Sequence, residues 1–588
     1  MGFLKPTTPV IDHAEWSTGT RAERIVPMAR HWAEVGFGTP VVMHLFYVVK
    51  ILLYTLAAWL IALSTTGIDG FTNVWHWYAE PIVFEKVVLF TMLFEVVGLG
   101  CGFGPLNNRY LPPMGSILYW LRPRTIRLPP WPRRVPLTKG DSRTPVDALL
   151  YGALLVMLVI ALASDGTGPM PEIGSRVGVL PTWQIATTVG LLAVVGLRDK
   201  VIFLAARGEV YGSFTVAFLF ADQSGVDLIL AAKLVCVTIW LGAASSKLTK
   251  HFPFVISTMM SNNPVLRPKA IKRRFFEHFP DDLRPGRPSR WLAHVSTAVE
   301  GLVPLVLLFS HGGALTTIAA IVMLCFHFGI LSAIPMGVPL EWNVFMMFSV
   351  VALFVGHEHV GLGDMTSPLP LLLFAAVAGT VILGNFFPRK ISFLPGMRYY
   401  AGNWDVTLWC VKPSASAKIE NGIVSIASMP QSQMAKIYGS PQMAEMYLYM
   451  GYAFRCFNSH GRAMFTLAHR AMARVDESEY ILIDGERICS TAVGWNFGDG
   501  HMHNEQLIEA LQRRCHFEPD EVRIVLIDAQ PIHRQRQEYR LVDAATGEFE
   551  RGYVRVADMV TRQPWDDTVP VHVDVSSTSP ALPVINRE

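Results

Sequence analysis

Nine apolar stretches, each about as long as a membrane-crossing helix, dominate the first two-thirds of this 588-residue chain. A helix needs about 20 mostly apolar residues to cross the hydrocarbon core of a bilayer. Hydrophobic residues make up 51% of the chain and charged residues only 16%, and a soluble core could not cover so much apolar surface. We therefore predict an α-helical polytopic membrane protein with about nine transmembrane helices. The predicted spans are 41–64, 82–102, 147–164, 183–206, 227–247, 292–310, 313–335, 340–356 and 369–387, within a transmembrane domain of residues 41–388.

After Pro388 the sequence becomes charged and mixed, which predicts a soluble α/β domain over residues 389–568. Residues 441–475 have the periodicity of an amphipathic helix. Residues 543–548, Asp-Ala-Ala-Thr-Gly-Glu, predict the turn of a β-hairpin. The tail 569–588, rich in Pro, Ser and Thr, is predicted to be disordered. Strands are predicted at 479–483, 486–494, 521–528, 537–543 and 551–558.

The leader of residues 1–40 contains one helical pattern. Ile25, Met28, Ala29 and Trp32 recur at helical spacing, with arginines between them. This pattern fits a short helix lying in the membrane interface. It fits equally a segment that packs on the protein itself.

Two loops between the predicted spans are rich in Lys and Arg. Residues 105–146 carry eight of them and residues 248–291 carry nine. Cytoplasmic loops carry an excess of Lys and Arg, so the first loop is predicted to be cytoplasmic and, with two spans before it, the N-terminus as well. Nine simple spans would place the second loop on the opposite side, against the rule. Either the short apolar piece 211–221 also crosses the membrane, or the second loop is a folded exception, and the side of the C-terminal domain stays open.

The net charge and the cysteine pattern limit the kinds of binding partner and covalent link that we expect. The formal net charge of +3 gives no reason to expect nucleic acid as a partner. The lipid bilayer and a hydrophobic small molecule or lipid are the expected partners, and a multi-pass protein of the cell membrane is the expected class. The seven cysteines are scattered, with no C-x-x-C pair, and their spacing predicts free thiols.

Ionisable residues inside the apolar stretches single out a candidate catalytic site. Lys247 follows the small residues Gly242–Ser246 at the end of a span, and a lysine at the mouth of an apolar cavity can act as a base when burial disfavours its ammonium form. Glu95, Glu300 and His327 lie deep in their spans, where such groups usually face a protein interior or a wet cavity. The alternatives are that Lys247 snorkels to the interface and that His327 hydrogen-bonds a neighbouring helix.

The segments that hold three of these residues resemble a known family. Residues 242–252 read Gly-Ala-Ala-Ser-Ser-Lys-Leu-Thr-Lys-His-Phe, Glu300 precedes the run Leu-Val-Leu-Leu-Phe, and Phe326 and His327 follow in the next span. In this order they resemble the vitamin-K-dependent γ-carboxylase family and its bacterial relatives, the horizontally transferred transmembrane domain (HTTM) proteins, over residues 215–355.

The resemblance implies that Lys247 deprotonates a reduced quinone and that His327 lies near the same cavity. Ser246 stands where the family has the first of two lysines. The whole chain also resembles an uncharacterised transmembrane family found mainly in actinobacteria, in segments such as 395–409 and 494–507. That family brings no known activity with it.

A second cluster of polar residues lies in the C-terminal domain. Asp499, His501 and His503, with Glu505 beyond, place four possible ligands within seven residues, and alternate His and Asp in a turn can meet at a metal ion. The alternative is that Asp499 and Asn504 shape the turn and cap the helix that follows.

These features support readings from different functional classes. The first is an intramembrane enzyme that acts on a quinone or other lipid with Lys247 as base. The second is a non-enzymatic lipid-binding, transport or scaffold protein of the cell envelope, because polar residues in a cleft also serve binding. A third, a metal-dependent hydrolase, depends wholly on Asp499, His501 and His503.

Overall fold

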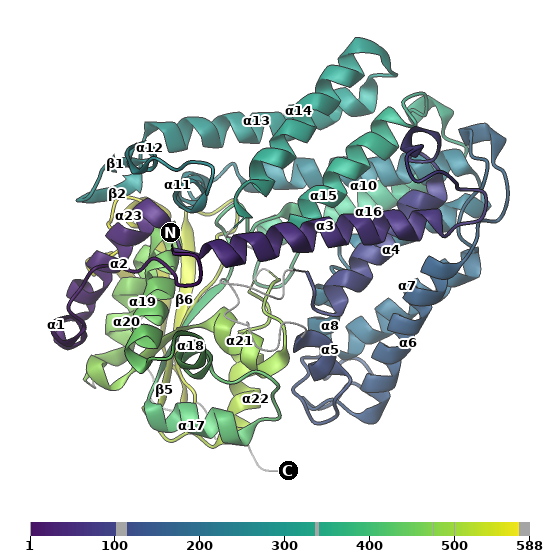
Figure 1. The fold of residues 1–588 in the computed structure, drawn as a ribbon. Helices are drawn as coiled ribbons and strands as arrows, with labels where there is room; N and C mark the ends of the chain where they lie inside the picture. Colours follow the sequence, from purple (N-terminus) through teal and green to yellow (C-terminus); the bar gives the residue numbers. More distant parts are fainter. Residues whose placement is uncertain (1, 101–114, 335–339, 474–475, 499, 575–588) are drawn as a thin grey trace.

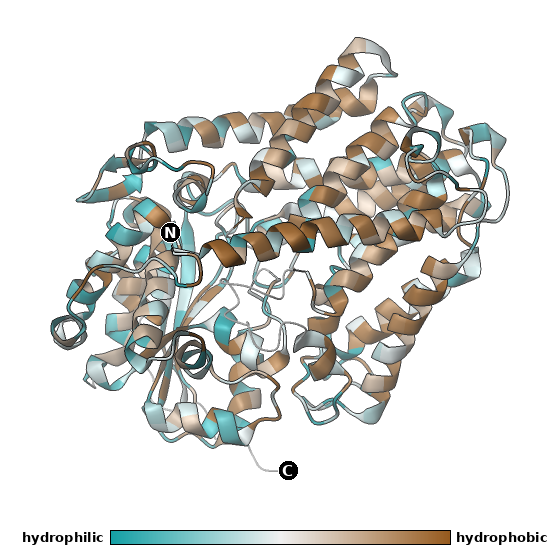
Figure 2. Cartoon of the chain, viewed as in Figure 1, coloured by the Kyte–Doolittle hydropathy of each residue, from teal (hydrophilic) through white to brown (hydrophobic). Residues whose placement is uncertain are grey.

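The computed structural model describes residues 2–100, 115–334, 340–473, 476–498 and 500–574 (Figure 1). A helical part made largely of apolar helices lies against a C-terminal part built on a β-sheet, and Figure 2 shows the contrast in hydropathy between them. Among the described residues, six helices are long and apolar enough to cross a membrane. They are α3 (Val41–Leu63), α6 (Pro145–Ala163), α10 (Gly225–Ser246), α13 (Arg287–Phe309), α14 (Gly313–Leu331) and α16 (Leu369–Phe386).

The prediction of nine spans is not confirmed, because three predicted spans form shorter helices. In the described part of the stretch 82–102 the helix ends at Val96, and Gly98, at φ +93°, has the left-handed conformation that commonly ends a helix. The stretch 183–206 is divided at Asp199, whose carboxylate caps the next helix. The shorter helices are α4 (Pro81–Val96), α7 (Thr182–Arg198), α8 (Lys200–Ala205) and α15 (Leu340–Ser349), which continues into the π-helix η5 (Val350–Val355).

The connections between these helices meet at two opposite ends of the helical part. At the end far from the sheet, the N–H of Thr66 donates to Asp165 (2.7 Å) and that of Thr366 donates to Asp227 (2.8 Å). Thr182, at the start of α7, bonds Asp222 at the same end. The connections that gather here are 64–80, 164–181, 219–224, 310–312 and 356–368.

Both basic loops, the first of them from residue 115 onward, lie at the other end, against the C-terminal part. From the first loop, Ser116 donates to the carbonyl of Gly494 (2.9 Å), and Asp141 accepts from Arg514 (2.8 Å). The second loop reaches the same part through His251. The two loops share an end because α8, α9 (Tyr211–Phe218) and the 3₁₀ turn η3 (Leu219–Asp222) lead the chain back to the far end before α10 begins.

The C-terminal part contains a six-stranded antiparallel sheet in the order β4-β3-β5-β6-β7-β8. The hairpin predicted around residues 543–548 is confirmed, since it joins β6 to β7. Strand β3, which lies between β4 and β5, was not predicted, and all six of its residues are buried. The strands are β3 (Val406–Val411), β4 (Ile481–Asp484), β5 (Val522–Ile527), β6 (Arg536–Asp543), β7 (Gly547–Arg555) and β8 (Val571–Val573).

Two predictions of local structure in this part are wrong. Residues 486–494, predicted as a strand, lie in helix α21 (Gly485–Val493), because Asp484 caps its start and Gly494 ends it at φ +82°. The single helix predicted over 441–475 is two helices, α19 (Pro441–Phe457) and α20 (Ser459–Met472), since Asn458 is extended.

The N-terminal helix α2 (Arg21–Val35) packs on α19 with its apolar face turned toward the protein. Trp32 is fully buried and stacks on Phe454 with ring centroids 5.4 Å apart. Arg21 donates to Glu477 (2.9 Å). The six described cysteines are free.

Candidate functional site

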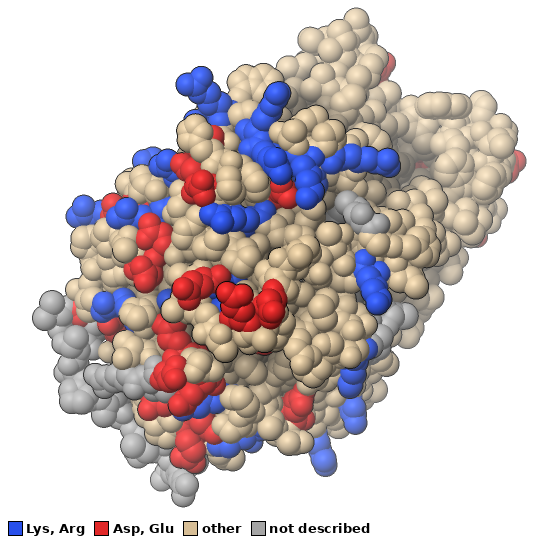
Figure 3. Space-filling model, turned by 60° about the vertical axis from the view of Figure 1, so that its left-hand side comes forward, with Lys and Arg blue, Asp and Glu red and all other residues tan. Residues whose placement is uncertain are grey.

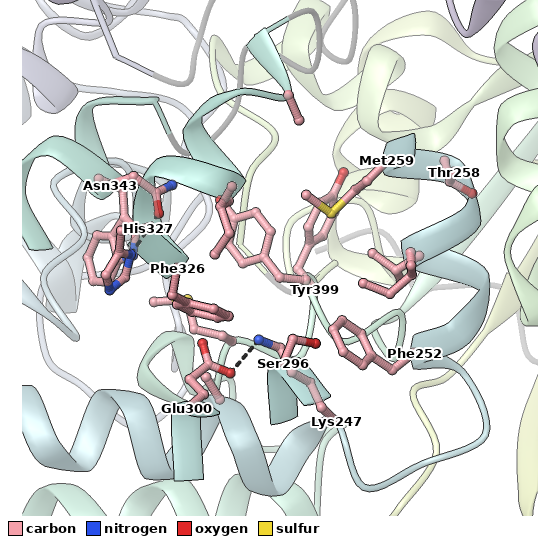
Figure 4. Close-up of a pocket in the computed structure, with 18 of the residues that line it drawn as sticks. Lys247, Phe252, Thr258, Met259, Ser296, Glu300, Phe326, His327, Asn343 and Tyr399 are labelled. Atoms are coloured by element: carbon pink, nitrogen blue, oxygen red, sulfur yellow. Dashed lines mark hydrogen bonds and ion pairs between the residues drawn. The ribbon is translucent and has the colours of Figure 1, made fainter. Parts of the chain in front are cut away.

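A cavity of about 150 Å³ lies where the helical part meets the C-terminal part (Figure 4). Lys247, Glu300 and His327 all line it, so the structure brings together three of the four ionisable residues that the sequence singles out in the apolar stretches. The rest of the wall is mainly aromatic and aliphatic. Its other members include Trp240, Phe252, Met259, Phe326, Trp342, Met346, Met397, Tyr399, Tyr400, Trp404, Phe454 and Asn458.

The ammonium of Lys247 forms an ion pair with the carboxylate of Glu300 on α13 (Figure 4). Both side chains are only 7% exposed, and the ammonium also lies 5.0 Å from the centre of the Phe252 ring. Glycine 242 explains how α10 delivers this lysine, because a Cβ there would lie 2.9 Å from the carbonyl oxygen of Pro395. The small residues before Lys247 therefore let the chain after α16 approach α10 closely.

His327 is held by hydrogen bonds at both ring nitrogens. The indole N–H of Trp240 can only donate, so Nε2 of His327 accepts it (3.0 Å). Nδ1 then carries the proton and donates to Asn343 (2.8 Å). The alternative reading of this histidine, a hydrogen bond to a neighbouring helix, is what the geometry shows.

The C-terminal part contributes a cluster of polar side chains that begins at Tyr399 in the cavity wall. The hydroxyl of Tyr399 lies 3.4 Å from Glu486, which accepts from Arg455 at 2.5 Å. Arg455 also pairs with Asp484. Burial raises the pKa of Glu486 to about 7. Sequence reasoning missed this group, because no short spacing joins Tyr399 to residues more than fifty positions away.

The loop after Lys247 is tied to the C-terminal part by a buried histidine. Nε2 of His251 donates to Gln530 (2.7 Å), and Nδ1 accepts from the hydroxyl of Ser459 (2.5 Å). The direction follows from Gln530, whose amide nitrogen donates to the carbonyl of Arg534 and so turns its oxygen toward His251. Burial lowers the pKa of His251 to about 4.

The other sequence candidates lie elsewhere. Glu95 pairs with Arg207 (3.0 Å) and does not line the cavity. Nδ1 of His503 lies 3.0 Å from the hydroxyl of Thr407, and Nε2 of His501 lies 3.9 Å from Asp405.

The metal-site prediction includes Asp499, which lies outside the described residues. Within the described part of the chain, no group of three His, Cys, Asp or Glu is placed to hold a metal ion. Asn504 caps helix α22 (Glu505–Cys515) by accepting from the N–H of Gln506 (3.2 Å), as the alternative reading of this turn requires.

Comparison with known proteins identifies the family but no activity. No curated protein and no solved structure matches the chain, and nothing found links it to the γ-carboxylase or HTTM proteins. One family does match, over residues 1–574, and it is described as transmembrane proteins of unknown function. This multi-pass membrane protein therefore belongs to the family of transmembrane proteins of unknown function DUF3556.

Proposed function

We propose that this protein binds a hydrophobic molecule with a polar end, such as a lipid or a quinone, in the cavity beside Lys247. The observation that carries the proposal is the composition of the wall, where one buried ion pair stands among aromatic and aliphatic side chains. Ligand sites commonly combine a mainly apolar lining with a few placed polar groups. The apolar wall would hold the tail or ring, and the pair of Lys247 and Glu300 would hold the polar end.

A second function, an intramembrane enzyme, is favoured by the presence of Lys247, Glu300 and His327 on one cavity. If a ligand hydroxyl enters beside the pair and Lys247 gives its proton to Glu300, the neutral amine could then take the proton of that hydroxyl. His327 would fix Trp240 and Asn343 in the wall rather than move protons, because both of its ring nitrogens are already bonded.

Mass spectrometry of lipids and quinones that co-purify in detergent tests the binding. We expect a defined species on the wild type and its loss in Ala243→Phe, because Ala243 lines the cavity and a ring there would fill it. Lys250→Ala, at an exposed site that does not line the cavity, is the control and should keep the species. The proposal is wrong if Ala243→Phe retains the same species in the same amount.

The enzyme reading needs a further result with the recovered molecule. Chemical change of that molecule by the wild type, with binding but no change by Lys247→Met, would support Lys247 as the base. Equal turnover by both proteins would exclude that role.

We also propose that the protein resides in the cell membrane with its N-terminus and C-terminal part in the cytoplasm. Arg176 is the one Lys or Arg in the described connections at the far end, whereas both basic loops lie at the end beside the C-terminal part. Cytoplasmic loops are the ones that carry Lys and Arg.

Cysteine labelling of intact cells with an impermeant maleimide tests this orientation. Gly363→Cys, exposed at the far end, should react in intact cells. Thr546→Cys, exposed in the β6–β7 turn, should react only after the cells are permeabilised. The parent protein measures the background of the native cysteines, and the reverse pattern would overturn the orientation.

A further inference from the structure

The connection between α11 (Phe252–Asn262) and α13 is folded and anchored. It contains α12 (Lys269–Arg273) and a hairpin of β1 (Phe276–His278) and β2 (Asp282–Pro285). The buried Lys272 donates to the carbonyl of Ser261 (2.5 Å), and the buried Ser289 donates to that of Phe275 (2.7 Å). The side chains on this connection therefore project from a fixed support.

This connection carries more cations than its carboxylates can neutralise. Residues 248–291 hold nine Lys and Arg against three Asp and Glu. Glu34 of α2 adds a fourth carboxylate and pairs with Lys269 (2.8 Å) and Arg273 (2.5 Å). Within the described chain, no ion pair is found for the exposed side chains of Lys250, Arg267, Arg274 and Arg287.

Two of these cations, Arg274 and Arg287, lie close together at one surface. The carbonyl oxygen of Arg274 is within 3.0 Å of a Cβ built on Gly286, the residue before Arg287, so the backbones that carry the two arginines are neighbours. Figure 3 shows Lys and Arg side chains gathered over the upper part of the face on which α12 and the start of α13 come forward.

Exposed apolar side chains flank this surface where the candidate span α13 begins. Arg287 is the first residue of the candidate span α13, and Trp291, one turn further, is 67% exposed. Val265, beside Arg267, is 71% exposed. Tryptophan is enriched at the level of the lipid headgroups, and cations at that level meet the phosphates of the leaflet.

We propose that Arg267, Arg274 and Arg287 form a binding site for the headgroups of anionic phospholipids, with Trp291 and Val265 packed among the upper acyl chains. The fixed backbone distinguishes this site from a flexible basic loop, because its arginines need little ordering to meet a phosphate. None of these residues lines the cavity beside Lys247, so the site stands whether or not that cavity binds a ligand.

Native mass spectrometry of the full chain in detergent tests the proposal. Delipidated protein is titrated with phosphatidylglycerol and with phosphatidylcholine of the same acyl chains. We expect more phosphatidylglycerol than phosphatidylcholine adducts on the wild type. The preference should fall by about fivefold for each arginine removed in Arg274→Gln/Arg287→Gln.

Lys436→Gln/Arg555→Gln is the matched control, since it removes two exposed cations from the C-terminal part, and it should keep the preference. Millimolar inorganic phosphate should not compete if the ligand is a lipid. Strong competition would instead assign the site to a free phosphate.

Equal adducts of the two lipids on the wild type would overturn the proposal, as would an undiminished preference in the double variant. If the double variant does not fold, Trp291→Ala gives the second test. This exposed side chain makes no described core contact, and its removal should weaken the binding of phosphatidylglycerol.

Discussion

Both partners of the ion pair of Lys247 and Glu300 are buried. Removing one charge should therefore destabilise the protein more than removing both. Lys247→Met leaves Glu300 without its cation in an apolar wall, which should cost about 3–5 kcal/mol of stability. Lys247→Met/Glu300→Leu removes both charges and should recover most of that loss. Thermal unfolding in detergent, followed by tryptophan fluorescence, measures both variants, and a single variant as stable as the wild type would contradict the expectation.

His251 predicts a dependence of stability on pH. Because burial lowers its pKa from about 6.5 to about 4, the unfolded chain binds a proton in this window that the folded protein does not. The free energy of unfolding should therefore be fully retained above pH 6.5 and should fall as the pH drops toward 4. We expect His251→Gln to reduce the slope of the free energy of unfolding against pH, between these pH values, by the equivalent of about one proton. His278→Gln, at an exposed site, should leave the slope unchanged.

Single residues show what sequence alone can reach. That Lys247, Glu300 and His327 are unusual followed from the cost of ionisable groups in hydrocarbon. Their partners did not follow, because Lys247 meets Glu300, and His327 meets Trp240, only through the packing of helices that are distant in the chain. The Tyr399 group was missed for the same reason.

At the scale of elements, α2 is held by its apolar face rather than by the ion pairs along it. Trp32 is fully buried between Phe37, Phe454 and Phe457. Trp32→Ala should cost about 3–5 kcal/mol, since the neighbouring rings cannot close the cavity. Trp75→Ala, at a side chain 80% exposed, should change stability by less than about 0.5 kcal/mol. The comparison is made by thermal unfolding, and equal losses in the two variants would show that α2 contributes little.

Elements were predictable where the apolar pattern and the end signals agreed. The hairpin at 543–548 satisfied both. Residues 486–494 were misread because β-branched residues outweighed two signals that were present in the sequence, the cap Asp484 and the terminator Gly494. Apolar length alone also failed to predict where the helices end, since Gly98 and Asp199 end helices inside stretches that stay hydrophobic.

At the scale of the whole molecule, hydrogen bonds join the C-terminal part to the helical part. Trp120 donates to the carbonyl of Val493 (3.0 Å) and Gln506 donates to that of Pro129 (2.8 Å). Residues 389–574 produced alone should therefore lack a cooperative thermal transition. Circular dichroism during heating checks this, with the full chain in detergent as the reference. A sharp transition in the isolated segment would show that it is an autonomous domain.

The sequence placed the boundary near Pro388 and left two arrangements open for the basic loops. The open question concerned the short apolar piece 211–221, whose length and composition do not determine whether the chain returns to the far end before α10. In the structure Asp222 bonds Thr182 at the far end, so the described parts of the two basic loops lie at the same end.

Residues of both parts of the molecule line the cavity, so any bound molecule would contact both parts and stabilise their association. By mass action, an occupant present at 100 times its dissociation constant adds about 2.7 kcal/mol to the folded assembly. If extraction from the membrane removes the bound molecule, the association of the C-terminal part with the helical part would weaken before any helix unfolds. Protein purified with and without its native lipids would differ first in the stability of the interface between the helical part and the C-terminal part.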